Sequence, residues 1–236
     1  PETSAAEKFT ALNMNQKVYF HRLGAAQSED RVIVEDPARP DVGWGADVTD
    51  DGRYLVVSSW RGTDGNGLRF IDLALNEKVT IAVDDFANNH IVIGNVGSTF
   101  FVQTDFGAPN NRIVAVDAGD PAPDKWRTII PEGQFPIDGA NHVGGRLIVQ
   151  YLEHAKSVVR VHETDGALSR TVELPGIGAV AGFGGEADDP ETFYLFTSFN
   201  RPTTIYRYDV AAGESAIVKA PELKFNPDDY VVEQAF

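Results

Sequence analysis

The chain has 236 residues, 42% of them apolar, including 14 Phe, 7 Tyr and 3 Trp. This composition excludes a disordered protein, because it supplies enough apolar side chains to bury a sizeable core. The net charge is −15, and an acidic surface repels phosphate backbones and anionic lipid, so we expect no nucleic acid and no membrane among its partners.

The N-terminal part of the chain predicts a loop followed by two strands. Residues 1–15 are polar with few strand formers, and read as a loop or linker. Alternating apolar and polar residues over 17–23 predict the first strand, and residues 31–35 predict the second after a turn rich in Gly, Ser and Asp. These two strands lack preceding partners in the chain, so we interpret them as the outer half of a sheet.

Four fuller units follow, each with four predicted strands and short turns. The strands are predicted over 44–49, 54–59, 68–73 and 79–83; 91–95, 99–104, 112–117 and 126–130; 140–143, 146–152, 158–162 and 169–174; and 177–182, 192–199, 203–209 and 216–219. No segment of helical length shows a helical period with caps. Residues 229–236 predict one more strand. Because it stops without a turn, we expect the natural protein to continue.

A fixed repeat runs through the four units. The third strand of each closes on a polar residue, and these residues lie 45, 45 and 47 positions apart: Asp72, Asp117, His162 and Asp209. The second strands keep nearly the same period. A repeat of this length with several strands is typical of propeller blades. The sequence therefore predicts an all-β protein over residues 16–229: a β-propeller with four-stranded antiparallel blades, of which the chain holds about four and a half.

The residues that usually carry chemistry form no recognisable catalytic or metal motif. There is no Gly-x-Ser-x-Gly, and none of the five histidines pairs with another at metal-ligand spacing. The absence of cysteine excludes disulfides and thiolate metal sites. Residues 47–52 lack the ligand spacing of a calcium loop, and 62–67 lack the Lys of a phosphate loop. We expect no catalytic residue, no metal and no cofactor in this chain.

One candidate binding site remains in the first full unit. Trp44, Trp60, Arg61 and Thr63 are predicted to lie around the ends of its inner strands and the following loop. An aromatic surface beside a cation can hold an amphipathic or anionic group of a ligand. The alternative is that these side chains only pack between neighbouring blades.

Several segments together resemble the propeller of the prolyl oligopeptidase family, above all prolyl endopeptidases. They are residues 17–24 with 27–30, residues 50–55, residues 124–126 with 130–132, residues 193–199 and residues 229–236. The resemblance covers the chain from about Lys17 to Phe236.

This resemblance implies a seven-bladed propeller over an α/β-hydrolase domain that carries a serine catalytic triad and cleaves short peptides after proline. By this resemblance the first two blades and the hydrolase domain would lie outside this chain, and residues 230–236 would begin the strand leading to that domain. The implied partners are this hydrolase domain and short proline-containing peptides, whose access the propeller gates. The resemblance also implies that this chain has no peptidase activity by itself. We expect a cytoplasmic location, with a periplasmic or secreted one as alternatives.

The resemblance also implies that the Trp60–Thr63 loop lines part of the substrate cavity. Many relatives have cysteine at Thr63, their arginine is shifted by one position relative to Arg61, and Gly43 stands where an apolar contact is expected.

Two other functions compete with this hypothesis. The first is a stand-alone propeller that acts as a binding or interaction module, with closure of its first and last strands as the discriminating feature. The second is a propeller enzyme with its own axial metal site, such as a lactonase. The lack of repeated Asp, Asn and Glu ligands on the inner strands argues against it.

Overall fold

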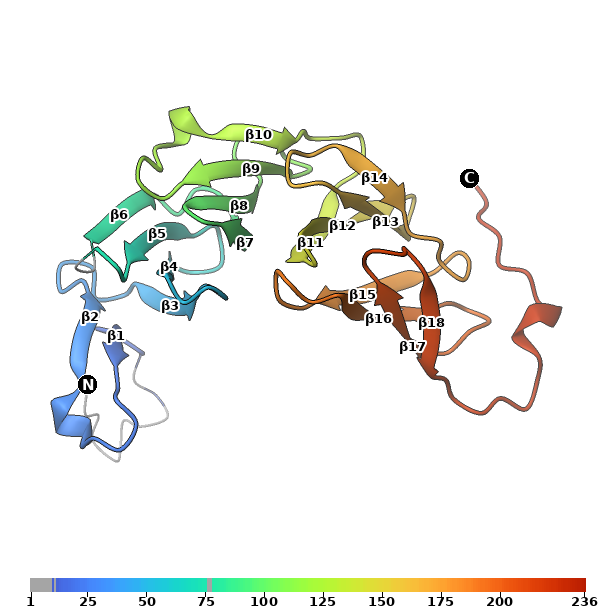
Figure 1. Ribbon diagram of the computed structural model, residues 1–236, viewed down its shortest axis with the longest axis horizontal. Coiled ribbons are helices and arrows are strands. Elements are labelled where there is room, and N and C mark those ends of the chain that lie inside the picture. The colour runs from blue at the N-terminus through green and yellow to red at the C-terminus, as the bar shows by residue number, and fades with distance from the viewer. Residues whose placement is uncertain (1–9, 11, 76–77) are drawn as a thin grey trace. The chain divides into compact units, whose positions relative to one another are not determined.

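The computed structural model describes residue 10, residues 12–75 and residues 78–236 (Figure 1). The chain divides into two compact units, residues 1–90 with 118–126, and residues 91–117 with 127–236. Throughout the described residues the regular structure is β-strand, apart from short 3-10 turns at Gln27–Glu29, Pro123–Lys125 and Pro227–Asp229.

The first unit contains a two-stranded and a four-stranded antiparallel sheet. The smaller sheet pairs β1 (Lys17–Phe20) with β2 (Arg31–Glu35). The larger has the order β3-β4-β5-β6, in which each strand pairs with its neighbour in sequence. Its strands are β3 (Gly43–Val48), β4 (Tyr54–Trp60), β5 (Gly67–Asp72) and β6 (Lys78–Val83).

The turn between β3 and β4 shows how local sequence sets the register of a blade. The Thr49 hydroxyl donates to the Asp51 carboxylate at 2.6 Å, and the Gly52 backbone N–H donates to the Thr49 carbonyl at 2.7 Å. Gly52 has a φ of 69°, a conformation that glycine adopts without strain. The turn therefore fixes the pairing of Val48 with Leu55 and of every residue pair beyond it.

The second unit contains three four-stranded antiparallel sheets, built in the same consecutive order. Their strands are β7 (His90–Val96), β8 (Thr99–Thr104), β9 (Arg112–Asp117) and β10 (Arg127–Ile130); β11 (Ile137–Val143), β12 (Arg146–Glu153), β13 (Lys156–His162) and β14 (Leu168–Thr171); and β15 (Ala179–Gly184), β16 (Glu191–Thr197), β17 (Thr204–Asp209) and β18 (Ser215–Lys219).

The repeat read from the sequence corresponds to these sheets. The third strand of each four-stranded sheet ends at the predicted residue: Asp72, Asp117, His162 and Asp209. All strands predicted between residues 17 and 219 are present, with shifts of a few residues at their ends. The prediction of four-stranded antiparallel blades is therefore confirmed.

Two predicted features differ. β1 ends at Phe20 and does not reach Leu23, because a turn closed by the Ala25 N–H on the Arg22 carbonyl at 3.0 Å begins there. The strand predicted over 229–236 is wrong: a 3-10 turn occupies Pro227–Asp229, and residues 230–236 form no strand. An alternating sequence becomes a strand only where another strand pairs with its backbone. The predicted N-terminal loop lies largely outside the described residues, because it includes residues 1–9 and 11.

Each unit has an apolar core formed by alternate residues of facing sheets. In the first unit, Trp44, Val57 and Ile71 of the β3–β6 sheet pack with Val34 of β2 and Val42. In the second unit one cluster joins the β7–β10 and β11–β14 sheets, and another joins the β11–β14 and β15–β18 sheets. The burial of apolar side chains between sheets is the main favourable contribution to the stability of such a fold.

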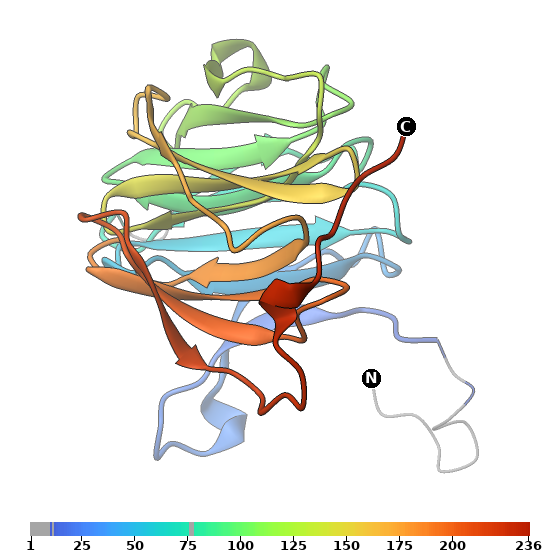
Figure 2. The ribbon, with the colours of Figure 1, turned by 90° about the vertical axis from the view of Figure 1, so that its right-hand side faces the viewer.

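The segment that follows β18 runs to the C-terminus outside the sheets (Figure 2), and side-chain bonds hold it to turns from two sheets of the second unit. The Asn200 side-chain amide donates to the carbonyls of Pro227 and Tyr230, both at 3.0 Å, and Arg201 pairs with Asp228. Further along, the Gln234 side chain donates to the carbonyl of His154 in the β12–β13 turn. The segment is therefore fixed by specific contacts although it belongs to no sheet.

Candidate functional site

The candidate site lies at the end of the β3–β6 sheet where β4 passes into β5. Trp60 is the last residue of β4, and Arg61 and Thr63 follow in the exposed connection. The end of this connection nearest β5 is fixed, because the Asn66 side chain donates to the His90 carbonyl at 3.0 Å and accepts from the His90 N–H at 2.7 Å. The loop thus presents Arg61 and Thr63 to solvent from a fixed support.

Trp60 lies across two glycines of the adjacent strand. A Cβ atom added to Gly43 would stand 2.5 Å from the indole Nε1 and Cε2, and one added to Gly45 would stand 3.3 Å from Cζ3. Both glycines therefore leave room for the ring to cover the β3 backbone. The Trp60 side chain remains exposed, with 40% of its surface accessible. This arrangement provides an aromatic surface whose backing is backbone and not side chain.

Trp44 occupies the opposite face of the same sheet. Gly43 pairs with Trp60 and Trp44 pairs with Ser59, so the two indoles alternate to different sides. Trp44 is only 9% exposed and belongs to the apolar core. The Arg69 guanidinium stands over its ring, 4.6 Å from the centroid. The structure therefore groups Trp60, Arg61 and Thr63 and separates Trp44 from them.

Arg61 is held by an acidic partner that the sequence did not single out. Its Nε donates to a carboxylate oxygen of Asp41, in the connection between β2 and β3. This hydrogen bond from Arg61 lowers the pKa of Asp41 below its usual value, so the pair stays charged at neutral pH. The Arg61 side chain is 58% exposed, and an ion pair this accessible is worth little in stability. Its importance lies in directing the guanidinium.

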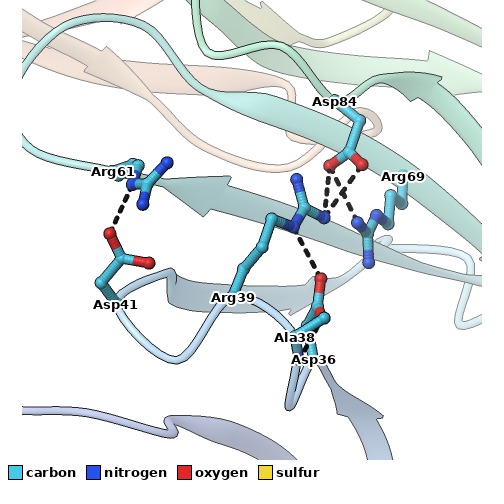
Figure 3. Close-up of polar contacts among 7 residues, drawn as sticks. All are labelled: Asp36, Ala38, Arg39, Asp41, Arg61, Arg69 and Asp84. Atoms are coloured by element: carbon cyan, nitrogen blue, oxygen red, sulfur yellow. Dashed lines mark hydrogen bonds and ion pairs between the residues drawn. The ribbon is translucent and has the colours of Figure 1, made fainter.

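A second cluster of charges lies beside this pair (Figure 3). Arg39 donates from Nε to Asp36 at 2.7 Å and from a terminal nitrogen to both oxygens of Asp84, at 3.1 and 2.9 Å. Arg69 donates to Asp84 at 2.9 Å. The members come from three separate parts of the first unit, and no spacing in the sequence brings them together. Sequence reasoning therefore missed them.

No further chemistry is evident at the site. Among the described residues no group of three or more His, Asp and Glu side chains is arranged to hold a metal ion. None of the helical turns in the described part of the chain has the length and apolar character of a membrane-spanning segment. The site offers an aromatic ring, a guanidinium and a hydroxyl, which suit binding of a ligand.

The comparisons with known proteins agree with the blade architecture. A family model described as the prolyl oligopeptidase N-terminal β-propeller domain matches residues 1–221. The chain belongs to this family. The resemblance read from its sequence is thereby confirmed, and its sheets are propeller blades.

Two similar curated proteins are both named prolyl endopeptidase. The one from Elizabethkingia meningoseptica is 39% identical over 220 residues, covering 93% of this chain and 31% of the relative. The one from Dictyostelium discoideum is 27% identical and covers 96% of this chain and 32% of the relative. The chain thus spans about a third of the length of the curated relatives it matches.

Solved structures show the same fold. One, from a structural and mechanistic study of two prolyl endopeptidases and the role of inter-domain dynamics, matches with a TM-score of 0.83 and 34% identity, covering 93% of this chain and 32% of that one. Prolyl oligopeptidase B from Galerina marginata without ligand matches with a TM-score of 0.81 at 23% identity, with coverage of 92% and 32%. The latter likeness is one of fold alone.

Proposed function

We propose that this chain is the propeller portion of a serine-type prolyl endopeptidase, where it gates the access of short proline-containing peptides and lines part of the substrate cavity. Its membership in the family is the observation that carries the proposal. The catalytic serine, aspartate and histidine would belong to an α/β-hydrolase domain of the same protein, and no cofactor is required. The cytoplasmic location stays a prediction.

Trp60, Arg61 and Thr63 would contact the peptide directly. The exposed indole can stack on an apolar side chain or a proline ring, and the guanidinium can donate to a carboxylate or carbonyl oxygen of the peptide. Trp44 would contribute from the opposite face by packing β3, the strand that the Trp60 ring covers, onto the core. This division of roles follows the burial of Trp44 and the exposure of the other three residues.

Substitution in the intact peptidase tests the lining role. We expect Trp60→Ala, Arg61→Ala and Thr63→Ala each to raise KM for a proline-containing peptide, by roughly threefold to tenfold for Arg61→Ala if it binds a peptide oxygen. Arg53→Ala is the matched control, because Arg53 lies beside the β3–β4 turn and pairs with Asp72. Unchanged KM and kcat in the three loop variants would contradict the lining role.

The division of labour has its own test. A chromogenic peptide with a scissile bond after proline should not be hydrolysed by residues 1–236 alone, and should be hydrolysed by the full-length protein. Hydrolysis by the isolated chain would place catalytic residues within it and overturn this part of the proposal.

A further inference from the structure

The connection between β2 and β3 consists of two successive turns that share Arg39. The Arg39 N–H donates to the Asp36 carbonyl, and the Val42 N–H donates to the Arg39 carbonyl, both at 3.2 Å. Asp41, the partner of Arg61, lies inside the second turn. Its position therefore depends on how firmly Arg39 is held.

Arg39 is held by its side chain as well as its backbone. Its guanidinium binds Asp36 within the first turn and reaches across to both carboxylate oxygens of Asp84, which follows β6. The same guanidinium stands 5.6 Å from the centroid of the Phe86 ring. A fork that uses Nε for one carboxylate and a terminal nitrogen for another is specific to arginine.

Asp84 in turn is fixed to the body of the sheet. It accepts a second hydrogen bond from Arg69 of β5, whose side chain is only 11% exposed and lies over the buried Trp44 ring. The connection is therefore anchored, through Asp84, to a largely buried side chain of the sheet.

This series of contacts ends at Arg61, which bonds Asp41. Its bond to Asp41 is made by Nε, so the two terminal nitrogens extend beyond the ion pair (Figure 3). The direction of these donors is set by where Asp41 stands. Asp41 stands two residues after Arg39, inside the second turn that the Arg39 carbonyl closes.

We propose that Arg39 is a positioning residue for the substrate-binding loop: by anchoring the 36–42 connection on Asp84, it places Asp41 so that Asp41 orients Arg61. The consequence for peptide binding rests on the proposed function, whereas the orientation of Arg61 does not. Arg39 itself has no contact with the peptide in this scheme.

The experiment observes the Arg61 Nε–H signal by NMR in the full-length protein labelled with [15N]arginine, and assigns it by its loss in Arg61→Lys. Asp41→Asn gives the position of this signal when the ion pair is broken. We expect Arg39→Ala and Asp84→Asn to move the signal toward that position and Arg39→Lys to move it part of the way. Glu35→Gln is the matched control, because it breaks the nearby Lys17–Glu35 pair and should leave the signal in place.

An Arg61 signal unchanged in both folded variants, Arg39→Ala and Asp84→Asn, would overturn the inference. Asp84→Asn keeps the shape of the side chain, so it tests the anchor even if Arg39→Ala does not fold. KM for the peptide is measured in parallel, with an expected rise of roughly threefold in Arg39→Ala and little change in kcat. If the Arg61 signal moves in Arg39→Ala while KM is unchanged there and in Arg61→Ala, the positioning role stands and the substrate-binding role of Arg61 fails.

Discussion

Trp60 lies across Gly43 of the neighbouring strand, so closely that a methyl group on Gly43 would stand 2.5 Å from the indole ring. A contact that short cannot persist, and the partly exposed ring is the part that can move. The position of the aromatic surface at the candidate site is therefore controlled by a residue that has no side chain.

We expect Gly43→Ala to push the Trp60 indole away from β3 and into solvent. The cost in the free energy of unfolding should be about 1 kcal/mol or less, because the displaced ring is already partly hydrated. Acrylamide quenching of tryptophan fluorescence should increase. Gly45→Ala is the matched control, since its added methyl group meets the ring at 3.3 Å and should displace it less. Equal quenching in wild type and Gly43→Ala would contradict the prediction.

We expect one substitution in the two-residue turn between β12 and β13 to stabilise the folded protein. His154 and Ala155 have φ values of 51° and 59°, a conformation that is unfavourable for residues with a Cβ atom. Ala155→Gly should raise the free energy of unfolding by about 1 kcal/mol, measured by urea denaturation. Ala181→Gly in β15 is the control and should lower stability, because glycine weakens an ordinary strand. A loss of stability in Ala155→Gly would show that the turn is not strained.

We expect the folded protein to lose stability in mild acid because of His162. Its Nδ1 lies 3.0 Å from the Gly166 carbonyl, which can only accept, and its buried Nε2 has no partner among the described residues. Burial lowers the pKa of His162 below 6.5, with a further lowering by Arg160 that is opposed by the bond to Gly166. At neutral pH the folded protein therefore holds a neutral imidazole.

The sign of the pH dependence follows from this shift. Below pH 6.5 the unfolded chain binds a proton at His162 before the folded chain does, so the free energy of unfolding falls as pH drops from 6.5 toward the lower folded pKa. The contribution of His162 to the free energy of unfolding is fully present well above pH 6.5. His162→Asn keeps a donor for Gly166 but cannot titrate, and should lose less stability over this window. Parallel urea midpoints for both proteins between pH 7 and pH 5 would contradict the prediction.

We expect Asn200 to limit the mobility of the segment after β18. Its amide supplies the two hydrogen bonds that hold the Pro227 and Tyr230 carbonyls. Asn200→Asp has nearly the same shape but no donor, so hydrogen exchange at residues 226–232 should accelerate by about fivefold or more. Asn95→Asp in β7, whose side chain donates to the Gly97 carbonyl of its own turn, should leave that segment unchanged. Unaltered exchange in Asn200→Asp would mean that other contacts hold it.

Much of the fold was predictable because each blade is built from local patterns. Alternation marks the strands, Asp51 with Gly52 marks a turn, and the recurrence from Asp72 to Asp209 marks where each third strand ends. Residues 229–236 show the limit, since their alternation suggests a strand although no neighbouring strand pairs with them among the described residues.

The candidate site was predictable only in part. Trp44 and Trp60 both stand near strand ends, and the sequence suggested one shared surface. The pairing of Trp44 with Ser59 puts them on opposite faces, and a shift of one residue in register would have put them on the same face. Arg39 and Asp84 are 45 positions apart, so their pairing depends on tertiary packing.

The sequence by itself determined the blade repeat, the absence of cysteine chemistry and the resemblance to a family, because these depend on residue types and their spacing along one chain. Only the tertiary structure decided that Trp60 rests on Gly43, that Trp44 is buried under Arg69, and that Asp41 holds Arg61. Those relationships depend on strand register and on side chains meeting across separate segments, where a change of a few ångströms decides whether two groups touch.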